Sequence, residues 1–158
     1  MNIDLNSLYT PNIGSSMKDH IELLCELKIS LENLGIKAIQ LKDWSYGDIS
    51  LFIPNPDNKK QKIYFGISTY WWELSGCPFS ICLFKEGWDE NILKNELEKF
   101  ININRIDSLE LIFDNDNYPF IPVSSEYLKN ISLKDLSVHL ASFIENLNFP
   151  FKIEYPKW

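Results

Sequence analysis

Apolar positions recur along this chain with two different spacings, and the change from one to the other outlines the secondary structure. Between about Met17 and Leu34 they return every three or four residues, as on one face of a helix. Ser16 and Asp19 have the spacing of a capping box, and Gly35 stands where a left-handed C-cap is expected. The pattern therefore predicts a first helix from about Met17 to Leu34.

The next part of the chain alternates apolar and polar residues, which is the period of a half-buried strand. This pattern predicts four strands, at Ile36–Lys42, Asp48–Ile53, Lys62–Thr69 and Phe79–Phe84. A turn at residues 54–58 contains two prolines and separates the second strand from the third. Because the connections are short, an antiparallel meander is expected.

Helical spacing returns in the second half of the chain. Helices are expected to open at Asp89 and at Ser132, since both residues are good N-caps. Leu109–Phe113 is typical of a strand, and Phe149–Tyr155 of a short final strand or extended tail. Residues 114–131 are polar and contain prolines, which predicts mostly loop with one short helical turn at Ser125–Leu128.

These elements together predict an α+β fold. Its sheet would be mostly antiparallel, with a meander of about four strands plus one or two more, and three helices would pack on it. Residues 1–14 are expected to form an N-terminal tail or loop, because Pro11 and Gly14 interrupt regular structure. Residues 15–158 would be a single domain, in keeping with a length of 158 residues.

The predicted strands have two unlike faces. One face carries large aliphatic residues and phenylalanines, and is expected to be the core. The other face would carry only small or aromatic uncharged residues, namely Ser50, Phe52, Tyr64, Gly66, Ser68, Tyr70, Ser80 and Cys82. A face that meets water usually carries charged side chains, so either another helix covers this face or it is a contact surface.

The segment Tyr70-Trp71-Trp72-Glu73 concentrates aromatic residues at the end of the third predicted strand. If that strand continues past Thr69, neighbouring residues point to opposite faces. Trp71 would then join the core, and Trp72 would join the opposite face with Tyr64 and Tyr70.

Tryptophan and tyrosine dominate the energetics of many protein interfaces, and acidic residues lie close to them in this sequence. The predicted partner-binding residues are Trp44, Tyr46, Tyr64, Tyr70, Trp72, Glu73, Trp88 and Asp89. One alternative is that these rings complete the core at the ends of the sheet. Another is a small-ligand pocket lined by the same aromatic residues, with polar groups from Ser45, Ser68 and Glu73.

The charge of the chain restricts its partners. The formal net charge is -7, and Arg105 is the only arginine. No run of basic residues supplies the cationic surface that duplex nucleic acid or an anionic membrane requires, so neither is expected as a direct partner. An acidic surface suits a basic protein instead.

The sequence contains none of the common catalytic or metal-binding motifs. Its only histidines, His20 and His139, lack a nucleophile-elbow motif, and no Cys or His pairs have zinc spacing. Residues 114–117 begin like a calcium loop, but Pro119 and Ser125 stand where that loop needs Gly and Glu. The scattered glycines form no phosphate loop. No catalytic residue, metal or cofactor is therefore predicted.

Compartment is inferred from the cysteines and from the N-terminus. The three cysteines are an odd number without paired spacing, which argues against a disulfide framework. The first ten residues do not resemble a signal peptide, and no apolar stretch reaches transmembrane length. A reducing cytoplasm is expected, and the Ile-, Asn- and Lys-rich composition favours a bacterial or phage source.

These observations predict a non-enzymatic cytoplasmic protein that binds another protein. Its most specific form is an inhibitor or immunity-type protein that neutralises a basic toxin or nuclease through a convex or flat acidic patch. One alternative is an acidic dimeric chaperone for a secreted client. Another is an enzyme or degenerate nuclease-like domain, in which two or more carboxylates would converge in one cleft at the strand ends. For the nuclease, Asp48 is the candidate metal ligand, but residues 62–69 contain no second carboxylate.

Overall fold

The structure is a computed structural model that describes residues 13–44, 48–55, 60–84 and 88–147, with residues 13–17, 43 and 44 described as backbone alone. In these segments six strands form one sheet of order β1-β2-β3-β4-β6-β5, and every neighbouring pair is antiparallel. The strands are β1 (Gln40–Trp44), β2 (Asp48–Pro54), β3 (Lys62–Ile67), β4 (Phe79–Leu83), β5 (Ile112–Phe113) and β6 (Pro119–Val123).

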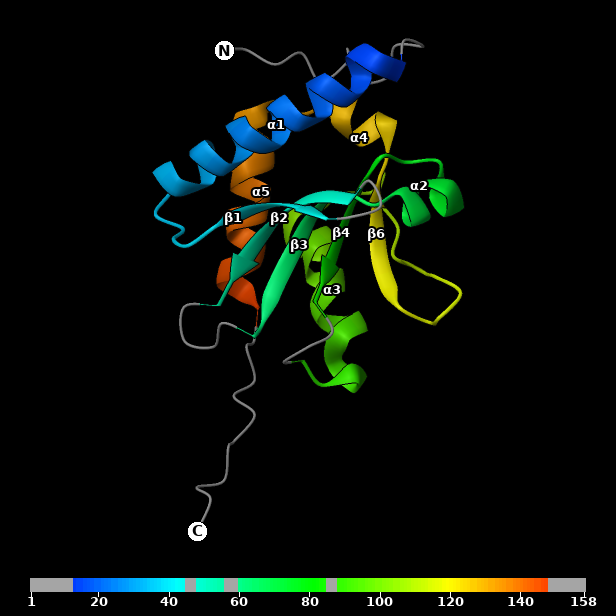
Figure 1. Ribbon diagram of the computed structural model, residues 1–158. Coiled ribbons are helices and arrows are strands. Elements are labelled where there is room, and N and C mark those ends of the chain that lie inside the picture. Colours follow the sequence, from blue (N-terminus) through cyan, green and yellow to red (C-terminus); the bar gives the residue numbers. More distant parts are fainter. Residues whose placement is uncertain (1–12, 45–47, 56–59, 85–87, 148–158) are drawn as a thin grey trace.

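Five helices accompany the sheet in the described part of the chain: α1 (Ile13–Asn33), α2 (Thr69–Ser75), α3 (Glu90–Asn104), α4 (Ser125–Lys129) and α5 (Leu133–Asn146). Helix α5 packs against both α1 and α3, and α2 lies beside β4 and β6 (Figure 1). The predicted α+β fold with an antiparallel sheet is confirmed, although the helices number five rather than three.

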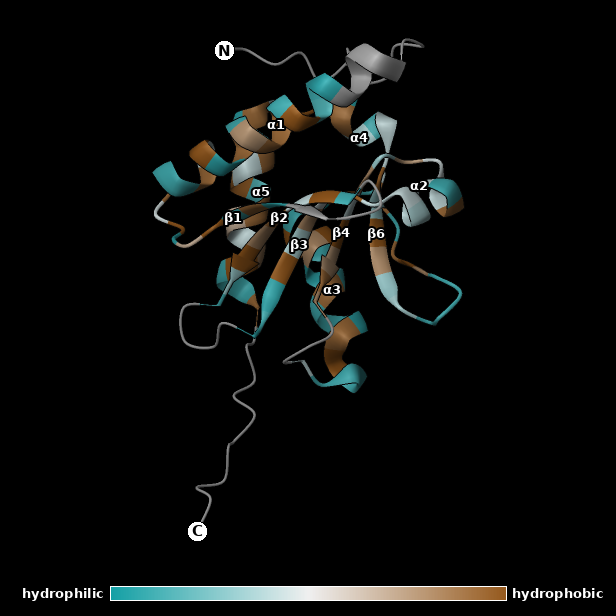
Figure 2. Cartoon of the chain, in the orientation of Figure 1, coloured by the Kyte–Doolittle hydropathy of each residue, from teal (hydrophilic) through white to brown (hydrophobic). Residues whose placement is uncertain are grey.

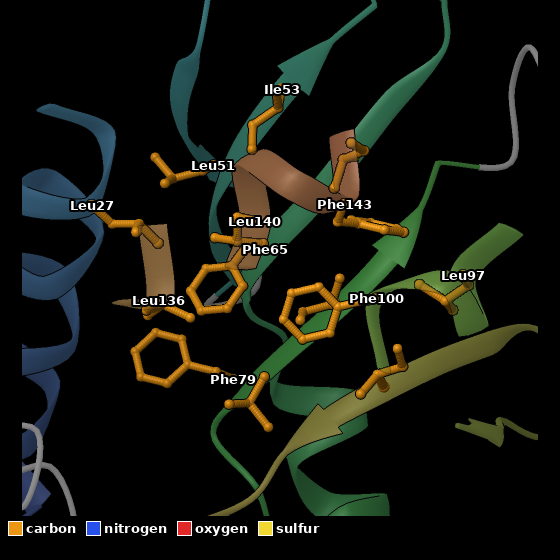
Figure 3. Close-up of a cluster of buried hydrophobic side chains, with 14 of the residues drawn as sticks. Leu27, Leu51, Ile53, Phe65, Phe79, Leu97, Phe100, Leu136, Leu140 and Phe143 are labelled. Atoms are coloured by element: carbon orange, nitrogen blue, oxygen red, sulfur yellow. The ribbon is translucent and has the colours of Figure 1, made fainter. Parts of the chain in front are cut away.

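The main core lies between one face of the sheet and helices α1, α3, α4 and α5. The strands contribute the residues that were expected on one face, such as Ile63, Phe65 and Ile67 of β3. In Figure 3, Phe65 and Phe79 from the strands lie beside Leu136 and Leu140 of α5, and Phe100 of α3 belongs to the same cluster. Burial of this apolar surface is the main term that stabilises the fold, at about 25 cal/mol per Å².

Hydropathy follows this arrangement along the chain. Figure 2 shows hydrophobic residues in brown along the central strands, and hydrophilic residues in teal in the loop that joins β5 to β6. That loop contains Asp114 and Asp116, which become important at the candidate site.

Several predicted boundaries need correction. The first strand begins at Gln40 rather than Ile36, because Ala38 has a φ of 62° and a strand cannot pass through a left-handed residue. The first helix begins at Ile13, which shortens the expected tail of residues 1–14, and β5 is two residues long instead of five. The predicted element at Phe149–Tyr155 lies outside the described residues.

The prediction of mostly loop for residues 114–131 is wrong, because Pro119–Val123 forms β6 between β4 and β5. This strand was not predicted because it contains two prolines. Pro119 is its first residue, and Pro122 pairs with Ser80 of β4 at a level where no residue of β5 is paired opposite. Both are positions at which a strand tolerates a missing N–H donor. The expected helical turn at Ser125–Leu128 is present as α4.

The second face of the sheet carries a row of small residues, Ser50, Gly66 and Ser80, on three neighbouring strands. Strands β2 and β3 approach so closely there that a Cβ atom on Gly66 would lie 2.3 Å from Ser50 Cβ and 2.5 Å from the Ile49 carbonyl oxygen. Glycine at this position therefore permits a strand contact that every other residue would prevent.

Replacing Gly66 tests this constraint. We expect Gly66→Ala to lower the free energy of unfolding by about 1–3 kcal/mol, because the new methyl group meets backbone atoms that cannot rotate away. The measurement is urea denaturation followed by circular dichroism. Ser80→Ala in the same row is the control, and should change stability by less than about 1 kcal/mol, since the buried Ser80 hydroxyl has no hydrogen-bond partner among the described residues. Equal stability of Gly66→Ala and the wild type would contradict the close contact.

Candidate functional site

The second face of the sheet holds a pocket of about 740 Å³, called here the aromatic pocket. Among the described helices, the buried hydrophobic side chains of α1, α3, α4 and α5 all belong to the main core on the other face. The pocket is lined by Asp48, Phe52, Tyr64, Ser68, Tyr70, Trp71, Cys82, Phe84, Asp114, Asp116 and Tyr118. Its size is that of a typical small-ligand site.

The floor of the pocket is one row of side chains across three strands. Phe52 of β2 lies opposite Tyr64 of β3, which lies opposite Cys82 of β4. The Phe52 ring meets the Tyr64 ring edge to face, with centroids 5.7 Å apart, and meets Phe84 in the same way at 5.5 Å. Edge-to-face packing fixes the ring orientations and gives the floor a rigid aromatic surface.

Trp71 of α2 forms one wall of the pocket. Its indole ring stacks on Phe120 at 4.8 Å and on Tyr118 at 5.9 Å, and it meets the Tyr64 ring edge to face at 5.6 Å. Trp71 Nε1 donates a hydrogen bond of 3.0 Å to Asp114 Oδ2. The Tyr118 hydroxyl donates in turn to the Leu83 carbonyl oxygen, so the wall is tied to the sheet at both ends.

Helix α2 was not predicted, and it reverses the expected places of the two tryptophans. Trp71 joins the cluster on the second face, whereas Trp72 packs half-buried against the main core with its ring edge-on to His20 at 5.8 Å. The predicted faces of the two tryptophans are therefore wrong, since Trp72 packs against the main core and Trp71 lies on the second face. In extended backbone the two would alternate, but successive helical residues differ by about 100° in direction.

Two acceptors and one glycine set the bounds of α2. The Thr69 N–H donates to Asp48 Oδ1 at 3.0 Å, and the Trp71 N–H donates to Ser68 Oγ at 3.4 Å. At the other end, Gly76 has a φ of 74° and its N–H donates to the Trp72 carbonyl oxygen. A capping serine followed eight residues later by glycine is a signal that could have identified this helix in the sequence.

Three aspartates, Asp48, Asp114 and Asp116, give the pocket its charge. Both carboxylate oxygens of Asp114 accept hydrogen bonds within the protein. Oδ1 accepts the backbone N–H groups of Asp116 and Tyr118, and Oδ2 accepts the Trp71 indole N–H. Asp48 Oδ1 accepts from Thr69, whereas Oδ2 of Asp48 and both oxygens of the exposed Asp116 accept no hydrogen bond from any described residue. Carboxylates that form no ion pair with a described residue, placed beside aromatic rings, make the pocket attractive to cations.

The ionisable groups of the floor remain protonated. Burial raises the pKa of Tyr64, and the proximity of Cys82 and of the Asp48 carboxylate raises it further. The nearby Ser50 hydroxyl acts slightly in the opposite direction, but the two hydroxyls do not meet in hydrogen-bond geometry, and neither has another partner among the described residues. Burial also raises the pKa of the Cys82 thiol, so it is not an activated nucleophile.

The chain places one of its own cations beside this floor. Lys42 of β1 lies on the second face of the sheet, opposite Ser50, and its Nζ atom is 5.6 Å from the centroid of the Phe52 ring. That distance is within the range of a cation–π contact.

The structure brings together some of the predicted site residues and separates others. Tyr64 and Tyr70 line the aromatic pocket, and Glu73 is exposed on α2. Trp88 is buried in the main core, and Asp89 caps α3 by accepting the Asn91 N–H. The Trp44 side chain and all of Tyr46 and Ser45 lie outside the description. The expectation that rings complete the core thus holds for Trp88.

Sequence reasoning missed four of the eleven residues that line the pocket. Asp114, Asp116 and Tyr118 were assigned to a polar loop, and Phe84 to the end of a strand. Nothing local in the sequence indicates that Tyr118 and Asp114 meet Trp71, because the meeting depends on the pairing of β6 with β4. The expected small-ligand pocket is present in outline, with Ser68 as a lining residue but without Glu73.

A second depression, of about 390 Å³, lies where α3, α4 and α5 meet and contains His139. Its Nδ1 atom is 2.9 Å from the Tyr127 hydroxyl, and its ring stacks on that of Tyr127. Burial lowers the pKa of His139, while the charge of Asp135 partly opposes the shift. Burial raises the pKa of Tyr127, so its hydroxyl stays protonated and available as a donor.

Among the described residues, no three His, Cys, Asp or Glu side chains gather where they could hold a metal ion. The described helices also include none with the length and apolar character needed to cross a membrane. In comparisons with known proteins, no family model, no curated protein and no solved structure matches this chain. The functional argument therefore depends on the geometry of the aromatic pocket.

The burial of His139 gives a prediction about pH. Its pKa in the folded protein lies below the ordinary value of about 6.5, so the folded state favours the neutral ring. The resulting stabilisation is complete above about pH 6.5 and is lost as the pH falls through the pKa of the folded state. We expect the urea midpoint to fall between pH 7.5 and pH 5, and to fall less in His139→Gln. An equal fall of the urea midpoint in the wild type and in His139→Gln would contradict a lowered pKa of His139 in the folded protein.

Proposed function

We propose that this chain is a non-enzymatic cytoplasmic protein that binds a basic protein partner. In its most specific form it is an inhibitor or immunity-type protein that neutralises a basic toxin or nuclease. The observation that carries the proposal is the aromatic pocket, which lies on the face of the sheet opposite the main core and is flanked by Asp48, Asp114 and Asp116. The net charge of -7 supports the same class of partner.

The surface around the pocket has the composition of a protein interface. Tyr70 is 41% exposed at the rim, and Leu74 and Glu73 of α2 extend an exposed surface beside it. Rigid aromatic groups supply binding energy at low entropic cost, and surrounding charges accelerate encounter with an oppositely charged partner. A basic loop that enters the pocket would combine these two contributions.

One observation favours the enzyme alternative. The carboxylates surround a concave pocket, and a convex or flat acidic patch had been expected for an inhibitor. Yet Asp114 uses both oxygens to hold Trp71 and its own loop in place, and the Cys82 thiol remains protonated. The pocket is therefore better suited to hold a ligand than to transform one, and we retain the binding proposal. The dimeric chaperone is the other alternative, and a monomer in light scattering would count against it.

Capture of the partner tests this proposal. We expect the tagged full chain to retain a basic protein from an extract of its native host, with retention that weakens as salt is raised. Tyr70→Ala combined with Asp116→Asn should reduce retention at least about tenfold, because both residues are exposed parts of the pocket rim. Mass spectrometry identifies the retained protein, and its toxicity should disappear when the chain is co-expressed.

A matched control is available on other surfaces. Ile29→Ala combined with Asp107→Asn removes one exposed apolar side chain and one exposed carboxylate away from the pocket. This variant should retain the partner like the wild type. Absence of a basic partner, or equal retention by the pocket variant, would refute the proposal.

A further inference from the structure

We infer that the aromatic pocket receives the guanidinium group of an arginine side chain from the basic partner. This inference rests on the proposed function, and it names the group by which the partner is recognised. It depends on the charge of the pocket, on the hydrogen-bonding groups at its floor and rim, and on the ring surfaces between them.

Charge complementarity is the first argument for a cationic ligand. Asp48 and Asp116 line the pocket with oxygen atoms that accept no hydrogen bond from the described residues. Neither aspartate forms an ion pair with any described lysine or arginine. A bound cation could pair directly with these carboxylates, which no described residue does, in a site where aromatic walls reduce screening by water.

The floor of the pocket favours a cation that carries N–H donors. Tyr64 is only 7% exposed, and its hydroxyl has no hydrogen-bond partner among the described residues. The oxygen of that hydroxyl is an acceptor at the floor of the pocket that Asp48 also lines, so a cation bound there can donate an N–H to it. A quaternary ammonium carries no N–H and would leave both the hydroxyl and the carboxylates without a directional partner.

Ring surfaces and separate acceptors favour arginine over lysine. The guanidinium group is planar and stacks on aromatic rings while its edge donates up to five hydrogen bonds. Phe84, Tyr70 and Tyr118 offer partly exposed rings around the pocket, and Asp48 and Asp116 approach from different segments of the chain. A lysine ammonium concentrates its three donors at one point and cannot bond several separated acceptors while stacking.

Lys42 indicates that this face already attracts a cation. Its ammonium group lies over the Phe52 ring, which also forms part of the pocket floor. Lys42 is thus an internal cation at the edge of the site, and its charge opposes the arrival of a second one. Removing that charge should strengthen arginine binding, whereas a merely structural role for Lys42 would leave the affinity unchanged.

Titration of the full ¹⁵N-labelled chain with Nα-acetyl-arginine methylamide tests the inference. We expect a saturable shift of the Trp71 indole N–H signal, which Trp71→Phe identifies among those of the five tryptophans. The citrulline analogue has nearly the same shape without the charge and should bind at least about tenfold more weakly. The trimethyl-lysine analogue should also bind more weakly than arginine.

Variants separate the contributions of individual residues. Asp48→Asn should weaken arginine binding about tenfold or more, and the exposed Asp116→Asn provides a second test that does not disturb the cap of α2. Lys42→Met should strengthen binding about two- to fivefold, which is the scale of one exposed cation–π contact. Asp107→Asn removes an exposed carboxylate that does not line the pocket, and it should leave the affinity unchanged.

The results that would overturn the inference differ from those that refute the proposed function. An unchanged Trp71 signal, equal binding of citrulline, or tighter binding of trimethyl-lysine overturns the arginine assignment, even if the pocket variant loses the captured protein. If the pocket binds arginine but the chain captures no basic protein, the preference of the pocket for a guanidinium group is upheld. The claim that this group belongs to a basic partner protein is then overturned.

Discussion

The cap that ends β3 and starts α2 is the constraint on which the candidate site depends. Ser68 and Asp48 accept the first free N–H groups of the helix, so the chain leaves the sheet immediately after Ile67. If the strand continued, the two tryptophans would project to opposite sides in the reverse order. Because the chain turns there, Trp71 covers the second face of the sheet and Trp72 completes the main core.

The two faces of the sheet meet different physical requirements. One face is covered by helices and needs little more than apolar side chains of suitable volume. The other has no long helix over it among the described elements, so its rings must pack on one another and on the short α2. These rings do not fill the space on this face, and a hollow of about 740 Å³ remains beside them. Asp114 holds the Trp71 ring in place and contributes to the negative charge of that hollow.

The sequence predicted the parts of the structure that depend on short-range signals. Local periodicity and capping predicted the strand that begins at Asp48 and the helix capped by Ser132. They also predicted the core face of Ile63, Phe65 and Ile67. Prediction from the sequence failed where long-range pairing overrides local signals. A proline such as Pro122 argues against a strand unless its N–H position faces no paired residue. That Pro122 lies beyond the short pairing of β6 with β5 is known only from the structure, so β6 was not predicted.

The candidate site was predictable only in part, for the same reason. Tyr64 could be placed on the second face from alternation alone, whereas Tyr70 lines the pocket from α2. The change of period after Ser68 moved Trp71 and Trp72 to places that alternation could not predict. Asp114 lies 43 residues from Trp71 in the chain, and only the inserted strand β6 brings the two together.

The insertion of β6 between β4 and β5 also determines the order in which the site is assembled. During synthesis the meander and α2 leave the ribosome before Asp114, Tyr118 and Phe120 have been added to the chain. Pairing β6 with β4 closes a long loop that includes α3, and such non-local closure is slow compared with formation of a hairpin. A nascent chain therefore contains most of the pocket-lining residues before the remaining three are added, and the pocket is complete only when the tertiary fold is complete.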